Sequence, residues 1–260
     1  MTVTWENRAE CSEQAVRPHA WQGLCGLYGM SIQGGGDSVF DLSGNGKHGV
    51  ISGPTWSGNT LYWDSTISHK ITTGVYSDAY TIIAHVKPTD ETYNCLYGCS
   101  AAKYYPAVYL NFSAGKPLLY AGSGIYRYFS ADAWTLLKNG DWHWVAFSIT
   151  GGAQADINNA AMYLDGIPIT GDAPVNTSAQ EAKVTGMIGK VHSDATAPVY
   201  RGYMGDLLYF NYALAAGEIA DVAALGADYC LARGRRGFVF SPPEETSGDI
   251  VVLRRRIEAA

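Results

Sequence analysis

Charged residues are scarce in this sequence. Only 16% of its 260 residues are Asp, Glu, Lys or Arg, and the formal net charge is −6. A chain of this sign has no general attraction for nucleic acid, so a nucleic-acid partner is not expected. No stretch of about 20 apolar residues is present to span a membrane, and residues 1–10 lack the apolar segment of a secretory signal peptide.

Catalytic signatures are missing as well. The sequence contains no Gly-x-Ser-x-Gly elbow, no His-Glu-x-x-His helix and no Gly-x-x-x-x-Gly-Lys loop. Glycoside hydrolysis needs two carboxylates, about 5–5.5 Å apart for retention or about 6.5–9.5 Å for inversion. The nearest pair, Glu218 and Asp221, falls in an expected helix rather than at alternate positions of a strand. The sequence therefore predicts a protein that is not an enzyme.

The cysteines give no clear cross-link. The chain has five of them, Cys11, Cys25, Cys95, Cys99 and Cys230, and an odd number leaves at least one unpaired within the monomer. Cys95 and Cys99 could meet across a turn, but no second close pair completes a zinc ribbon. We expect free, mostly buried thiols.

Glycine and tyrosine are abundant, with 30 and 18 residues, and 47% of the chain is hydrophobic. Aromatic residues favour strands and Gly marks bends, so this composition is typical of a β-rich protein. The clearest strand is Tyr80–Lys87, in which Tyr80, Ile82, Ala84 and Val86 share one face. Residues 142–149 form a second strong strand, and Asp165-Gly166 is a hairpin turn signal. Further short strand candidates are residues 24–30, 38–42, 50–51, 61–63, 67–71, 93–99, 107–112, 117–121, 125–129, 160–164, 186–189 and 203–211.

These elements predict an all-β, two-sheet antiparallel jelly-roll sandwich. One helix is expected, over about residues 215–225. Residues 1–22 form an N-terminal arm, residues 23–230 the sandwich, and residues 231–260 a C-terminal tail.

One loop carries a resemblance. Asp41-Leu-Ser-Gly-Asn-Gly-Lys-His-Gly49 contains three glycines that allow positive φ, and Asp41 and Ser43 can bond nearby amides. Asp-x-Ser-Gly-Asn-Gly-x-x-Gly resembles the signature loop of laminin-G-like, concanavalin A-like lectin/glucanase jelly rolls. Four more segments are similar to motifs of that family, in its order: residues 80–88, 141–146, 162–166 and 202–219.

The sequence departs from the family at two positions. Ala215 stands where family members usually place a Ser or Thr helix cap, and losing such a cap costs about 1 kcal/mol. Calcium-binding members often have Asp at the position of Gly205, whereas here the acid is Asp206. One step along a strand turns a side chain to the opposite face, which argues against an inherited calcium site.

Two kinds of binding site remain open. Asp41 and Asn45 could offer oxygens to Ca²⁺, or Asp41 and Ser43 could simply fasten the loop through main-chain bonds. Tyr104, Tyr105, Tyr126, Tyr128 and Trp134 lie in or beside expected loops, where aromatic rings with adjacent polar groups suit sugar faces. The alternative is that these rings belong to the core or to strand faces.

The termini are candidates for assembly contacts. We assign Trp5 in the arm and Phe238, Phe240, Arg254, Arg255 and Arg256 in the tail to contacts with other subunits. The tail's apolar residues 250–253 could add an edge strand to a partner, and the alternative for both ends is a solvated terminus.

The resemblance implies binding or assembly. Laminin-G-like domains usually work outside cells, whereas this Met-initiated sequence shows no secretion signal. A virion protein reconciles the two, because it is made in the cytoplasm and released on lysis. The sequence analysis therefore favours a phage-type virion decoration or surface protein that contacts other virion subunits and has no cofactor other than Ca²⁺. The alternative is a free-standing, extracellular or cell-surface carbohydrate-binding or adhesion module that recognises a cell-surface glycan. A glycoside hydrolase is less favoured.

Overall fold

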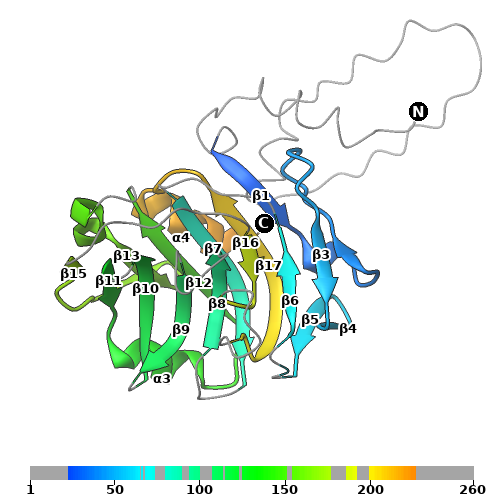
Figure 1. Ribbon diagram of the computed structural model, residues 1–260, viewed down its shortest axis with the longest axis horizontal. Coiled ribbons are helices and arrows are strands. Elements are labelled where there is room, and N and C mark those ends of the chain that lie inside the picture. The colour runs from blue at the N-terminus through cyan, green and yellow to red at the C-terminus, as the bar shows by residue number, and fades with distance from the viewer. Residues whose placement is uncertain are drawn as a thin grey trace, which may run out of the picture.

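The computed structural model describes residues 23–64, 66, 68–73, 80–89, 94–99, 107–113, 115–122, 125–150, 154–176, 186–191 and 199–226. Two antiparallel sheets stack face to face in this part of the chain (Figure 1). The predicted two-sheet antiparallel sandwich is therefore confirmed. The Cys25 and Cys95 thiols are free, and the side chains of the other three cysteines lie outside the described residues.

The first sheet has eight strands and is built around β17. In spatial order its strands are β14 (Ile167–Ile169), β13 (Ala161–Leu164), β12 (His143–Ile149), β7 (Tyr80–Pro88), β17 (Gly202–Phe210), β5 (Thr60–Trp63) and β4 (Thr55–Ser57), and β1 (Leu24–Tyr28) also pairs with β17. The turn between β13 and β14 is Asp165-Gly166, with φ of 51° and 80°. This is the two-residue hairpin that the sequence predicts.

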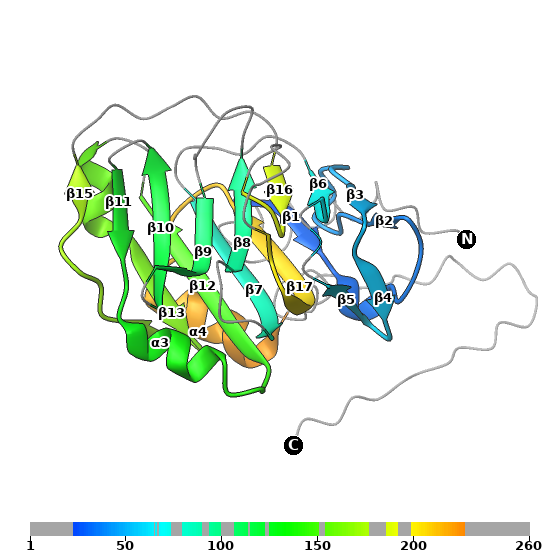
Figure 2. The same cartoon turned by 60° about the horizontal axis from the view of Figure 1, so that its bottom comes forward.

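The second sheet has nine strands. Their order is β15 (Val175–Asn176), β11 (Ile125–Tyr128), β10 (Lys116–Gly122), β9 (Ala107–Ser113), β8 (Asn94–Cys99), β16 (Gly186–Ile188), β6 (Lys70–Thr72), β3 (Gly49–Ser52) and β2 (Ser38–Val39). Figure 2 shows β8 to β11 side by side in this sheet.

The main core lies between the sheets. Tyr80, Ile82, Ala84 and Val86 of β7 point into it, as their alternation predicts. The opposite face of β7 is buried too at Ile83, which packs with Ala146 and Leu208 under a helix. Since both faces of its central strands are covered, the eight-stranded sheet is interior over part of its width.

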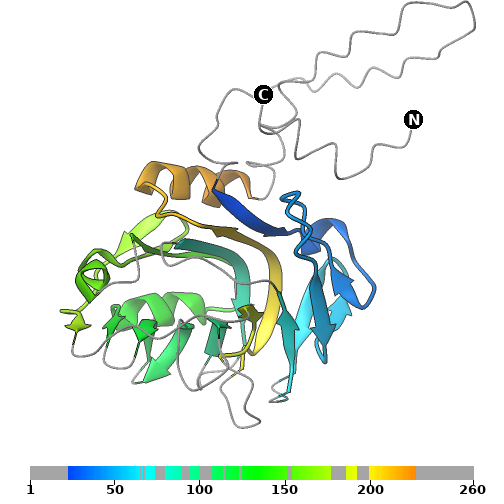
Figure 3. The ribbon, with the colours of Figure 1, turned by 45° about the horizontal axis from the view of Figure 1, so that its top comes forward.

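Four short helical segments occur in the described residues: η1 (Met30–Ile32), α3 (Ala131–Leu137), η2 (Gln154–Asn159) and α4 (Ala216–Leu225). Helix α4 is the predicted helix, and it lies on the outer side of the eight-stranded sheet (Figure 3). Helix α3 was not predicted. Its N-terminus is capped by Ser130, whose hydroxyl accepts the Asp132 N–H. No helix in the described part of the chain is both long and apolar enough to cross a membrane.

The N-terminus of α4 is only half capped. The Glu218 carboxylate accepts the Ala215 N–H at 3.0 Å, but Ala215 has no side-chain oxygen to return a bond. Ala215→Ser is expected to raise the free energy of unfolding by about 0.5–1 kcal/mol. Chemical denaturation measures this, with Ala224→Ser in the exposed last turn of α4 as a control that should not stabilise. An unchanged midpoint for Ala215→Ser would contradict the capping argument.

Candidate functional site

The signature loop is fastened by Asp41. Its Oδ1 accepts the N–H groups of Leu27 at 3.0 Å and Ser43 at 2.9 Å, and its Oδ2 accepts the Lys47 N–H at 3.0 Å. Asn45 donates its side-chain N–H to Leu24 O and Ser43 Oγ, both at 2.9 Å. Both Asp41 carboxylate oxygens are therefore engaged by the main chain, which supports the fastening alternative over calcium.

Asp206 is also used inside the fold. Its carboxylate accepts the N–H of Ser31 at 2.9 Å and the hydroxyl of Ser31 at 2.8 Å, so it holds η1 against β17. Gly205 instead lies under His85, where an added β-carbon would be 3.1 Å from Nδ1. Within the described residues, no three His, Cys, Asp or Glu side chains gather as a metal site.

Two of the predicted ligand residues form part of an aromatic cluster on the nine-stranded sheet. Tyr126 and Tyr128 of β11 pack with Tyr120 of β10 and with Tyr109 and Phe112 of β9. We call these five residues the tyrosine surface. They form a cluster separate from the main core, which contains their strand neighbours Ile125 and Leu119. Because successive side chains alternate across a strand, the four tyrosines face outward. Phe112 joins them on this side where the register between β9 and β10 is irregular.

Strand register sets the geometry of this surface. Tyr120 lies directly opposite Tyr126, and their rings stack with centroids 5.5 Å apart and planes at 23°. Tyr128 stands edge-on to Tyr126 at 5.6 Å, and Phe112 lies 4.9 Å from Tyr109. Tyr109 is buried, whereas the other four rings are partly exposed. The result is a platform of adjoining rings across three strands.

Trp134, predicted as a ligand residue, is not part of this platform. It lies in α3, is 3% exposed and packs in the main core. Its assignment to a sugar contact is therefore corrected: the helix that the sequence analysis missed turns this ring inward. Tyr104 and Tyr105 lie outside the described residues, as do Trp5, Phe238, Phe240 and Arg254 to Arg256.

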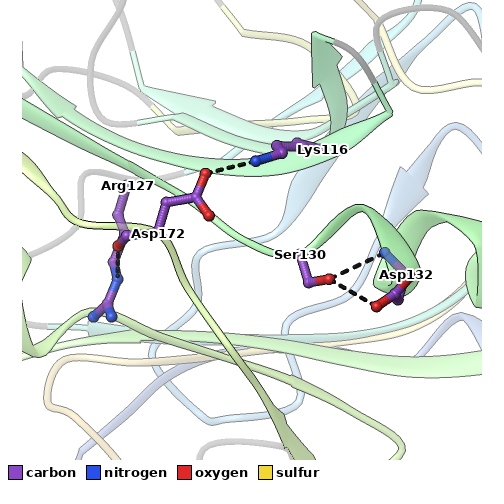
Figure 4. A network of polar contacts seen from close by, with 5 residues as sticks. All are labelled: Lys116, Arg127, Ser130, Asp132 and Asp172. Atoms are coloured by element: carbon purple, nitrogen blue, oxygen red, sulfur yellow. Dashed lines mark hydrogen bonds and ion pairs between the residues drawn. The ribbon is translucent and has the colours of Figure 1, made fainter.

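A polar network lies along β10, β11 and the start of α3 (Figure 4). It reaches the tyrosine surface at Tyr128, whose carbonyl accepts the Asp172 N–H at 2.8 Å. Lys116 Nζ pairs with Asp172 Oδ2 at 2.7 Å, and Ser130 caps α3 nearby. Arg127 donates to three main-chain carbonyls, those of Asp172 at 3.1 Å, Asn158 at 2.9 Å and Ala160 at 2.7 Å. Arg127 joins β11, and Lys116 joins β10, to the segments beside these strands, so the two cations do not by themselves indicate an acidic ligand.

Arg127 and Lys116 are expected to contribute unequally to the free energy of unfolding. Arg127→Met should lower the free energy of unfolding by about 2–3 kcal/mol, because three carbonyls lose a charged donor. Lys116→Met should cost less than about 1 kcal/mol, because its ion pair with Asp172 is exposed to solvent. Urea denaturation of both variants measures the difference, and equal losses would show that Arg127 does not join these segments.

A second aromatic group lies on the outer face of the eight-stranded sheet, and the sequence analysis did not find it. Its members are Tyr62, His85, Trp142, Trp144 and Tyr203, which we call the aromatic stripe. Trp144 stacks on His85 with ring centroids 4.7 Å apart and planes at 16°. The centroid of the Trp142 ring lies 4.6 Å from that of His85. The stripe continues to Tyr203, whose ring centroid is 6.5 Å from that of Trp142. It ends at Tyr62, whose ring centroid is 4.8 Å from that of Tyr203.

His85 is half-buried within the stripe. Burial between the rings lowers its pKa, while the carboxylates of Asp206 and Asp165 oppose this shift. Asp165 also accepts the main-chain N–H of Trp144 at 2.9 Å, and its other carboxylate oxygen lies 2.8 Å from His143 Nδ1. The Asp165 carboxylate thus lies at the Trp144 end of the stripe.

Solved structures show similar folds. A Trypanosoma rangeli sialidase in complex with 2,3-difluorosialic acid matches with a TM-score of 0.57 and 15% identity, over 84% of this chain and 37% of the sialidase. Domain 4 of AbnA, a GH43 extracellular arabinanase from Geobacillus stearothermophilus, in complex with arabinotriose, matches with a TM-score of 0.53 and 21% identity, over 77% of this chain and 98% of that domain. The binding domain of Paraclostridial Mosquitocidal Protein 1 matches with a TM-score of 0.53 and 12% identity, over 78% of this chain and 52% of that one. At these identities the likeness concerns the fold alone.

The family is established by sequence. No curated protein matches the chain. Residues 57–220, more than half of the chain, match the family described as the concanavalin A-like lectin/glucanases superfamily. This match covers the four later motifs, and together with the two-sheet sandwich it confirms the predicted family. The chain belongs to the concanavalin A-like lectin/glucanase superfamily.

Proposed function

We propose that this protein is a non-catalytic carbohydrate-binding domain whose ligand lies on the tyrosine surface. The observation that carries the proposal is the stacked pair of Tyr120 and Tyr126, continued by Tyr128. Sugar rings have apolar faces that pack on aromatic rings, and a few polar groups beside such rings fix orientation. At the Tyr128 end of this platform, the Asp172 N–H donates to the Tyr128 carbonyl at 2.8 Å. The ion pair of Asp172 with Lys116 is partly exposed there.

The proposal of a non-catalytic role rests on the same surface. Its five residues are aromatic and carry no carboxylate. Asp172 at its border is already paired with Lys116. A hydrolase would need a second carboxylate at a defined separation from the first. The arabinanase domain bound to arabinotriose and the sialidases give general support for a carbohydrate ligand.

The test is calorimetric titration with arabinotriose, sialyllactose and a panel of common oligosaccharides. Tyr126→Ala is expected to weaken binding about tenfold, which corresponds to about 1.4 kcal/mol. Tyr62→Ala removes a partly exposed tyrosine from the opposite sheet and should leave affinity unchanged. The proposal fails if no oligosaccharide binds, or if both variants bind like the wild type.

The phage-type virion role stays a prediction from the sequence. Its assembly residues, Trp5, Phe238, Phe240 and Arg254 to Arg256, lie outside the described part of the chain. Contacts with self or virion subunits, and a location on the virion surface or outside the cell, are likewise proposals. Oligomerisation of the full chain, or its binding to preformed particles, would support the virion role.

A further inference from the structure

The aromatic stripe is a partly exposed surface that the proposed sugar site does not use. Its rings come from β5, β7, β17 and the start of β12, on the face of the eight-stranded sheet that also carries α4. Helix α4 covers one part of this face with Ile219 and Val222, and the stripe lies beside the covered part.

The charges around the stripe favour a cation at one end. The carboxylates of Asp165 and Asp206 both raise the pKa of His85 against the effect of burial. The Asp165 carboxylate also accepts the main-chain N–H of Trp144 at 2.9 Å, which places a negative charge at the base of this ring. His143 Nδ1 lies 2.8 Å from Asp165 Oδ2, and burial lowers the pKa of His85. Lys87 lies opposite Tyr203 in the register of β7 and β17, so the Tyr203 end of the stripe already has a positive charge. A planar cation is therefore best placed near Trp142 and Trp144.

The chain itself leads to this end of the stripe. Helix α4 ends at Leu225, and Gly226 turns the backbone with φ of 63°. A β-carbon placed on Gly226 would lie only 3.2 Å from Trp144 Cζ2. The segment that follows contains Arg233, Arg235 and Arg236.

The length of this segment fits the stripe. Arg233 is seven residues beyond Gly226, a distance that an extended chain covers with about 23–25 Å of reach. Neighbouring ring centroids in the stripe are 4.6–6.5 Å apart. The arginines can therefore reach Trp144 and Trp142 without any change in α4.

We propose that residues 227–240 of the same chain dock on the aromatic stripe, with guanidinium groups of Arg233, Arg235 and Arg236 against the rings of Trp144 and Trp142. An arginine suits this surface because its planar group stacks on aromatic rings and remains charged beside carboxylates. The docked segment covers the stripe and fixes where the rest of the tail leaves the domain.

Nuclear magnetic resonance of the full chain tests this proposal. The indole N–H signals of Trp142 and Trp144 are assigned with Trp142→Phe and Trp144→Phe. The variant Arg233→Gln/Arg235→Gln/Arg236→Gln is then expected to shift both signals and leave that of Trp56 in place. Each lost contact should reduce the ratio of docked to undocked chains about two- to fivefold.

The matched control is Arg254→Gln/Arg255→Gln/Arg256→Gln, which removes the same charge further along the tail and should not move these signals. The proposal is overturned if the first variant causes no shift, or if both variants cause equal shifts. It is also overturned if the wild-type signals change with protein concentration alongside a dimeric mass, because the tail would then bind a second copy. Sugar binding at Tyr126 is unaffected by any of these outcomes.

Discussion

Asp41→Ala is expected to lower the free energy of unfolding by about 3–5 kcal/mol. The Asp41 side chain is 3% exposed, and its carboxylate accepts the N–H groups of Leu27, Ser43 and Lys47. Alanine leaves these donors without their acceptor, and each buried donor left unpaired costs about 1–3 kcal/mol. Urea denaturation followed by tryptophan fluorescence measures the loss.

Two comparisons sharpen this measurement. Asp37→Ala removes an exposed acid of the same segment and should change stability by less than about 0.5 kcal/mol. If main-chain bonds are the role of Asp41, wild type and variant should each melt at the same temperature in calcium and in EDTA. A wild-type melting temperature that rises only in calcium would instead support a metal at Asp41 and Asn45.

Gly98→Ala is the second large expected effect, with a loss of about 3–4 kcal/mol. Gly98 lies in β8, and the main chain of Val191 crosses directly over it. A β-carbon on Gly98 would be 2.0 Å from Val191 O and 2.5 Å from Val191 Cα. Because these are main-chain atoms, no side-chain rotation relieves the contact, and residues 189–191 must move away from the sheet.

Thermal unfolding provides the readout for Gly98→Ala. The melting temperature should fall by about 10 °C, given about 2–4 °C per kcal/mol for a domain of this size. Gly35→Ala is the control, because no atom lies within 4 Å of its added β-carbon. Equal melting temperatures for the two variants would show that Val191 does not cross Gly98 this closely.

The sequence predicts the fold well where a single strand carries its own pattern. Tyr80 to Val86 alternates so strictly that the inward face follows from residue spacing alone, and the structure confirms it. Asp165-Gly166 predicts its hairpin because the turn requires positive φ at both residues. Helix α3 begins with a capping signal, Ser130 followed by Asp132, but at two turns it is too short for an apolar periodicity to predict it.

The surfaces that could bind ligands were predictable only in part. Tyr126 and Tyr128 lie two residues apart in one strand, so the sequence places them on one face. Tyr120 joins them only through the register between β10 and β11. The stripe depends on longer pairings: Trp144 meets His85 only because β12 lies beside β7. Alternation gives the face on which a ring lies, whereas its neighbours across the sheet depend on the strand order.

The position of β17 has a consequence for folding during synthesis. This strand lies between β7 and β5 and also pairs with β1, although its residues, 202–210, come late in the chain. Until they leave the ribosome, one edge of β7 and one edge of β5 have no partner strand. Unpaired strand edges promote association with other chains. The nascent chain therefore exposes the unpaired edges of β7 and β5 through most of its translation. Pairing of β17 with both strands removes both edges in a single step.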